Sequence, residues 1–154
     1  MRAPARWKFV WIGGLVAGTL DILFAITFWA VKANVPAKRI LQSVAAGLLG
    51  RASFDGGWQT ALLGLMLHFF IAISMSFAYF ETAKRWPLLR NRPAMLGAAY
   101  GLVLYLFMNL VVLPLSAAGR PSRDPLWIGL SILVHAFFIG VPIALSARRA
   151  LSAQ

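Results

Sequence analysis

The sequence contains no cysteine. Disulfide bonds, zinc-thiolate sites, iron-sulfur clusters and a cysteine nucleophile are therefore excluded, and the redox state of the compartment is left open. Common enzyme motifs are also missing, since no G-x-S-x-G, H-E-x-x-H, P-loop or dinucleotide fingerprint occurs. These absences favour a protein that is not an enzyme, and no cofactor is predicted from a motif.

Acidic residues are scarce. There are 4 Asp and Glu against 15 Lys and Arg, which gives a formal net charge of +11. In a soluble domain this excess would suggest nucleic-acid binding. Here the basic residues lie between apolar runs, where they act as topology signals and contacts for anionic lipids. We therefore expect the bilayer and anionic lipids as partners, and no nucleic acid.

Charged residues are nearly absent from four long apolar runs, in a chain that is 60% hydrophobic. About 20 helical residues cross a hydrocarbon core of roughly 30 Å. The sequence therefore predicts one all-α integral membrane domain over residues 1–154, a four-helix bundle with four transmembrane helices. The predicted spans are residues 9–31, 60–80, 94–115 and 126–147.

The longest connection, between the first two spans, has its own helical pattern over about residues 36–50. Apolar residues recur there at helical spacing, with Lys38, Arg39, Gln42 and Ser43 on the opposite face. This pattern predicts a short helix in the membrane interface. A re-entrant segment, which Gly47 and Gly50 would tolerate, is the alternative.

The distribution of basic residues predicts the orientation. Nine basic residues lie on the side of the two termini and six on the other, which favours both termini in the cytoplasm. Tryptophans mark the span ends as an aromatic belt. At the inner boundary are Trp7, Trp11 and Trp86, and at the outer one Trp29, Trp58 and Trp127.

Each span carries one strongly polar residue: Asp21, His68, Asn109 and His135. A rise of 1.5 Å per residue places all four about 9 to 15 Å below the outer ends of their helices. An ionisable residue inside a span is a functional-site candidate. We therefore expect these residues to form one polar layer in the core of the bundle.

Small or polar neighbours share the helical faces of these four residues, where helices approach one another in lipid. The supporting positions are Gly14, Gly18, Gly64, Tyr105 and Ser131. Gly97 and Gly101 precede Asn109 on the third span, and GxxxG at Gly14/Gly18 and again at Gly97/Gly101 suggests two related hairpins.

The remaining acidic residues have local roles in this interpretation. Asp55 and Asp124 lie in the outer loops, where we expect each to cap a helix. Glu81 is expected to pair with Lys84 or Arg85 at one-turn spacing.

Three functions are open for the polar layer. In a proton or cation pathway His68 and His135 exchange protons, Asp21 sets their charge, and Asn109 orients them or the ion. In a structural or assembly subunit the same residues only hold the helices together. In a metal or haem protein His68, His135 and Asp21 would be the ligands, to zinc or to haem iron.

The chain resembles the bacterial inner-membrane proteins of the YagU type. The residues that carry the resemblance are the Gly14–Gly18 segment, His68, Tyr79, Pro87, Gly97, Gly101, Leu113-Pro114-Leu115, Trp127, His135 and Arg148-Arg149. Asp21 and Asn109 depart from that pattern. The resemblance implies a small helical protein of the bacterial inner membrane. The glycine-lined faces also suit a homodimer or a larger membrane complex.

Overall fold

The computed structural model describes residues 4–152. Within this range every regular element is helical. In chain order they are α1 (Pro4–Ala33), α2 (Ala37–Leu49), the 3-10 helix η1 (Gly50–Phe54), α3 (Gly57–Arg85), α4 (Leu88–Asn91), α5 (Pro93–Phe107), the π-helix η2 (Met108–Val112), α6 (Leu113–Leu115), α7 (Pro125–Val134), the π-helix η3 (His135–Gly140) and α8 (Val141–Ser152).

The expected fold class is confirmed. Between residues 4 and 152 there are 4 helical stretches long and apolar enough to cross a membrane: Arg6–Ala33, Gly57–Arg85, Pro93–Leu115 and Pro125–Ser152. Each contains one of the expected spans and extends beyond it at one or both ends. The protein is therefore an all-α, multi-pass membrane protein.

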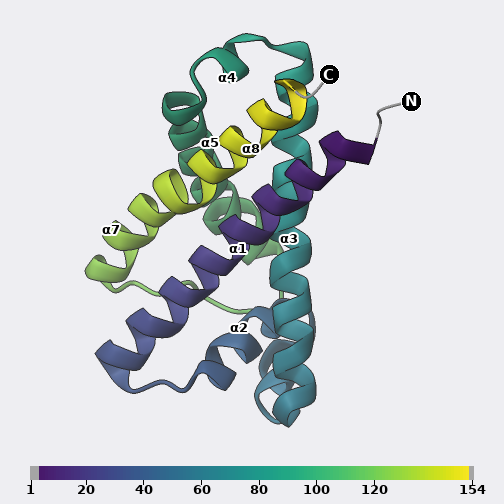
Figure 1. Ribbon diagram of the computed structural model, residues 1–154. Helices are drawn as coiled ribbons and strands as arrows, with labels where there is room; N and C mark the ends of the chain where they lie inside the picture. The colour runs from purple at the N-terminus through teal and green to yellow at the C-terminus, as the bar shows by residue number, and fades with distance from the viewer. Residues whose placement is uncertain (1–3, 153–154) are drawn as a thin grey trace.

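The final transmembrane helix, α7–η3–α8, is central to the bundle. α8 packs against α1, α3 and α5, whereas α1 packs against α3 and α8. In Figure 1, α1 (purple) and α8 (yellow) run side by side and α3 (teal) crosses behind them. We call the end of the bundle where α1 begins and α8 ends the terminal end, and the opposite end, beside α2, the loop end.

The hydrophobic core lies toward the terminal end. Its most buried large side chains are Val10 of α1, Tyr79 and Phe80 of α3, and Ile143 of α8. Small residues surround them, among them Ala83, Ala144, Ala147 and Ala150. Small residues let helix backbones approach closely, which is how helices associate where lipid removes the hydrophobic driving force.

The predicted small-residue faces are contact faces. A Cβ on Gly14 would lie 2.6 Å from the Cα of Ile73, so α1 and α3 meet there backbone to backbone. A Cβ on Gly97 would lie 2.7 Å from the Gly140 carbonyl oxygen, and one on Gly101 would lie 2.7 Å from the Cα of Ala136. The Gly97/Gly101 pair therefore forms the crossing of α5 with the final helix.

Gln42 is buried, although the sequence pattern predicts it on the exposed polar face of α2. It is fully buried against the start of α3. Its side-chain amide donates to the Gly57 carbonyl at 2.9 Å and lies 3.2 Å from Thr60 Oγ1. The Thr60 hydroxyl donates to the Ser53 carbonyl at 2.6 Å, so one polar cluster joins α2, η1 and α3.

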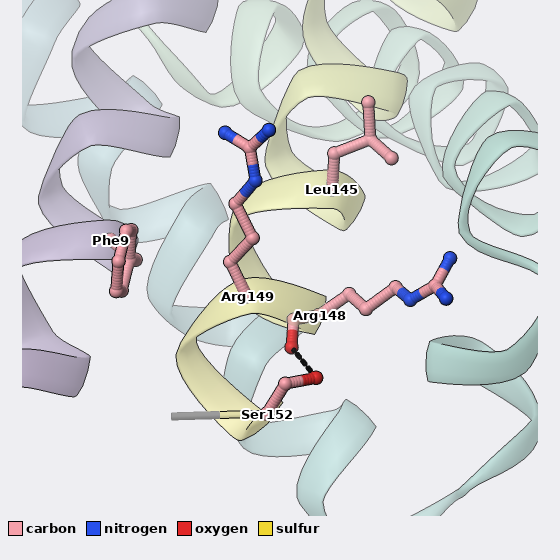
Figure 2. A pocket seen from close by; sticks show the side chains of 5 residues that line it. All are labelled: Phe9, Leu145, Arg148, Arg149 and Ser152. Carbon is pink, nitrogen blue, oxygen red and sulfur yellow. Dashed lines mark hydrogen bonds between the residues drawn. The ribbon is translucent and has the colours of Figure 1, made fainter. Parts of the chain in front are cut away.

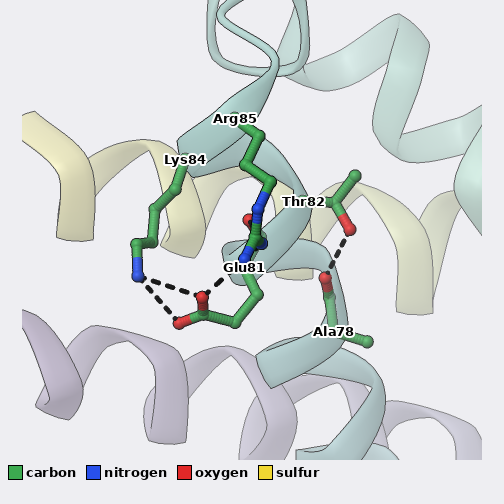
Figure 3. A network of polar contacts seen from close by, with 5 residues as sticks. All are labelled: Ala78, Glu81, Thr82, Lys84 and Arg85. Carbon is green, nitrogen blue, oxygen red and sulfur yellow. Dashed lines mark hydrogen bonds and ion pairs between the residues drawn. The ribbon is translucent and has the colours of Figure 1, made fainter.

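Glu81 pairs as expected near the terminal end (Figure 3). Its carboxylate lies 3.0 Å from Lys84 Nζ and 3.9 Å from Arg85 Nη1, one turn further along α3. Arg85 also donates to the Glu81 carbonyl at 3.0 Å. Both basic partners are exposed, so these ion pairs contribute little to stability.

The two aspartates that were expected to cap helices differ. Asp124 caps α7, because its Oδ1 accepts the Trp127 backbone N–H at 2.9 Å, and it also forms an ion pair with Lys32 at the end of α1. The expectation that Asp55 caps a helix is wrong. Gly56 is the N-cap of α3, and among residues 4–152 no side chain caps that end of the helix.

We expect acid to weaken this attachment of α7 to α1. The hydrogen bond from Lys32, with that from the Trp127 N–H, lowers the pKa of Asp124 from its ordinary value. A carboxylate with a lowered pKa stabilises the fold above about pH 4, and the contribution is lost as the pH falls through the folded pKa.

Tryptophan fluorescence against pH would measure this effect, because Trp127 stacks on Phe24 with ring centroids 5.4 Å apart and lies 5.3 Å from Trp29. The acid transition should disappear in Asp124→Asn and persist in the control Asp55→Asn. A transition unchanged in Asp124→Asn would contradict the assignment.

Candidate polar site in the membrane

His68 of α3 is fixed against the backbone of α1. Its Nε2 lies 2.8 Å from the Gly18 carbonyl oxygen. Because a carbonyl only accepts, the proton of the neutral ring is on Nε2, and Nδ1 keeps its lone pair. Glycine leaves room at this contact, since a Cβ at position 18 would lie 3.0 Å from the Phe69 ring and 3.1 Å from the Ala72 Cβ, and these side chains would have to shift slightly.

Asp21 lies three residues after Gly18 on α1, about 4.5 Å further toward the loop end. Its side chain is partly buried. Within residues 4–152 no hydrogen bond joins Asp21 to an imidazole, and His68 donates to the Gly18 carbonyl. Asp21 is thus about one turn of α1 away from the carbonyl that His68 contacts.

His135 of η3 is oriented by its own helix. Its Nδ1 lies 2.9 Å from the Ser131 carbonyl, one turn earlier, so Nδ1 carries the proton and Nε2 keeps the lone pair. The ring meets the Tyr105 ring edge-on, with centroids 5.3 Å apart at 82°. The Ser131 hydroxyl is buried and has no hydrogen-bond partner within residues 4–152.

Asn109 is the second residue of the π-helix η2 in the third span. Its Nδ2 donates to the Tyr105 carbonyl at 2.9 Å, and Tyr105 in turn touches His135 through its ring. Asn109, Tyr105 and His135 thus form one chain of contacts between α5–η2 and η3.

The predicted layer is therefore built as two groups. His68 of α3 contacts the α1 backbone one turn from Asp21, and Asn109 is linked to His135 through Tyr105. The two groups are on adjacent elements, because α1 packs directly against η3. Within the described residues no hydrogen bond joins one group to the other.

All but one of the supporting residues lie beside one of these two groups of polar residues. Gly14 and Gly18 bring α1 onto α3, while Tyr105 and Ser131 hold His135. Gly64 has a different role, because it faces the Leu41 carbonyl of α2 and allows that helix to lie against α3.

The two π-helical segments begin at or next to the polar residues, and the sequence analysis did not predict them. The Leu113 N–H bonds to the Met108 carbonyl and the Val141 N–H to the Ala136 carbonyl. In both cases the next residue is a proline, Pro114 or Pro142. Proline has no N–H and its ring clashes with the carbonyl four residues earlier, so a wider turn before it relieves the clash.

His68, His135 and Asp21 are the candidate ligands for a metal ion. Each imidazole donates one N–H to a backbone carbonyl and keeps its other nitrogen, which is the arrangement common for metal-bound histidine. Between residues 4 and 152, however, no three His, Asp or Glu residues are grouped closely enough to hold an ion.

No protein-family model, curated protein or solved structure matches this chain.

Proposed function

We propose that this is a small protein of the bacterial inner membrane, with both termini in the cytoplasm, that conducts protons or a cation through its polar residues. The excess of basic residues on the terminal side supports the orientation. The resemblance to YagU-type proteins supports a location in the bacterial inner membrane.

The observation that carries the proposal is the state of the two imidazoles. His68 and His135 each have one N–H held by a backbone carbonyl and one nitrogen with an available lone pair. A fixed ring of this kind accepts a proton at one nitrogen and releases it from the other. Histidine changes charge near neutral pH, which suits repeated transfer.

The other two residues have supporting roles in this mechanism. Asp21, one turn from the His68 contact, stabilises the positive charge of a protonated ring. A carboxylate in the middle of a bilayer costs about 2.5 to 3.5 kcal/mol to insert, and a nearby cation or proton offsets this cost. Asn109 holds the Tyr105 carbonyl and so supports the ring that orients His135.

The test is proton flux into proteoliposomes that contain a pH-sensitive dye. We expect His68→Ala, His135→Ala and Asp21→Asn each to reduce the flux to the level of empty liposomes, with the protein still folded. Asp55→Asn is the matched control, because it removes a carboxylate at the loop end and should retain full flux. Wild-type flux equal to that of empty liposomes would refute a proton pathway, and the same measurement with Na⁺ or K⁺ gradients tests a cation.

A structural role is the alternative, and the His68–Gly18 contact favours it because it fastens α3 to α1. Hydrogen bonds between membrane helices average about 0.6 kcal/mol. This alternative predicts a lower melting temperature for His68→Ala and no flux in any variant. It also predicts co-purification with a larger complex if the protein is an assembly subunit.

The third function, metal or haem binding, would be tested by an absorbance spectrum and a metal analysis of the same purified protein. A Soret band or stoichiometric zinc that disappears in His68→Ala would assign the histidines to haem or metal binding.

A further inference from the structure

Two hollows lie side by side at the terminal end, on the surface of α8. The first has a volume of about 450 Å³ and is lined by Phe9, Leu145, Arg148, Arg149 and Ser152. The second, also about 450 Å³, is lined by Arg90, Asn91, Arg148, Leu151 and Ser152. Arg148 and Ser152 line both hollows, so the two are neighbours that share one wall.

The first hollow combines positive charge with an apolar wall. Figure 2 shows two guanidinium groups leaving α8 in different directions, Arg149 alongside Leu145 and Arg148 away from it. Leu145 is 43% exposed, and Phe9 faces the same hollow from α1. The Arg149 guanidinium is thus placed where the apolar surface of the span meets the polar boundary of the membrane.

These arginines have no internal counter-ion in the part of the chain that the structure describes. The whole sequence contains 4 acidic residues. Glu81 pairs with Lys84 and Arg85, and Asp124 pairs with Lys32. Asp55 and Asp21 lie in the loop-end turn and within α1. Within residues 4–152, therefore, no carboxylate pairs with Arg90, Arg148 or Arg149, and these guanidinium groups are available to an external anion.

The Ser152 hydroxyl does not supply a donor to the hollows, because it donates to the Arg148 carbonyl at 3.0 Å. Binding therefore depends on the guanidinium groups. A guanidinium binds phosphate through two parallel N–H···O bonds, and basic pockets between transmembrane helices bind anionic lipid headgroups.

We propose that the paired hollows bind one phospholipid whose headgroup carries two phosphodiesters, as in diphosphatidylglycerol. One phosphate lies with Arg149 beside Phe9, and the other with Arg148 and Arg90. Acyl chains leave along the exposed side of Leu145 into the bilayer. This proposal is independent of the proton pathway, since its residues are at the terminal end and include none of the four polar residues of that pathway.

Native mass spectrometry of the detergent-purified protein tests the proposal with three probes: diphosphatidylglycerol, phosphatidylglycerol and inorganic pyrophosphate. We expect one diphosphatidylglycerol per protein, bound at least about tenfold more tightly than phosphatidylglycerol, because the second phosphate adds charge-assisted bonds. Pyrophosphate should not compete, because it lacks the acyl chains that contact the apolar wall.

The variants separate a built site from general attraction to a basic protein. The double variant Arg148→Gln/Arg149→Gln should weaken diphosphatidylglycerol binding at least about tenfold. Arg120→Gln/Arg123→Gln removes the same charge from exposed positions at the loop end and should leave binding within about twofold. Arg149→Gln alone serves as a second, milder variant, and the melting temperature checks that each variant is folded.

Three results would overturn the proposal. They are equal affinity for the two lipids, an equal loss of affinity in the control double variant, and competition by pyrophosphate at the affinity of the lipid. The first two would indicate diffuse electrostatic attraction, and the third would indicate a site for a soluble anion.

Discussion

Gly101→Ala is expected to destabilise the bundle by about 3 kcal/mol, since new atoms in a packed interface force the backbones apart. A Cβ at this position would overlap the His135 carbonyl oxygen and lie 2.7 Å from the Cα of Ala136. Both are backbone atoms, which cannot move aside by a rotamer change. The crossing of α5 with the final helix would open.

Unfolding of the detergent-purified protein by heat or by sodium dodecyl sulfate would measure this loss. Gly129→Ala is the matched control on α7, where a new Cβ has no neighbour within 4 Å. Because alanine favours a helix over glycine by about 0.5 to 1 kcal/mol, the control should be neutral or slightly more stable. Equal stability of the two variants would show that the glycine contact is not required.

Gly64→Ala is expected to release α2 from α3 while the four transmembrane helices stay folded. A Cβ at Gly64 would overlap the Leu41 carbonyl oxygen and lie 3.1 Å from the Ala45 backbone nitrogen. Moving α2 outward would also separate Gln42 from Gly57, so a buried amide would lose its partner at a cost of about 1 to 3 kcal/mol.

Hydrogen exchange would detect this release, because the amides of residues 37–49 should lose protection and those of α5 and α8 should keep it. Gly47→Ala is the control on α2 itself, since its Cβ would make only an ordinary 3.9 Å contact with Ser116. Retained protection of α2 in Gly64→Ala would contradict the prediction.

The fold class was predictable because membrane spans depend on length and hydrophobicity alone. The small-residue faces were predictable for a related reason, since close helix contacts in lipid require glycine or alanine, as at Gly14, Gly97 and Gly101. These two signals depend on residue type and spacing, and both are local in the sequence.

Other features depend on the three-dimensional packing and were missed. The burial of Gln42 was not predictable because its partner, the Gly57 carbonyl, is a backbone group of another helix. The donation of His68 to the Gly18 carbonyl was not predictable for the same reason, since a backbone carbonyl leaves no signal in the residue types. The π-helical segments had a signal that was overlooked, namely Pro114 and Pro142 inside apolar helices.

The two π-helical segments also bear on how related sequences should be aligned with this one. A π-helical turn holds one residue more than the α-helical turn that it replaces. A homologue that lacks one residue within 108–112 or 135–140 would convert that turn to an α-helix and keep the lipid-facing and protein-facing sides of both flanking segments. The same deletion elsewhere in a span would rotate every later side chain by about 100°. Single-residue gaps in these helices are therefore compatible with an unchanged fold at these two places.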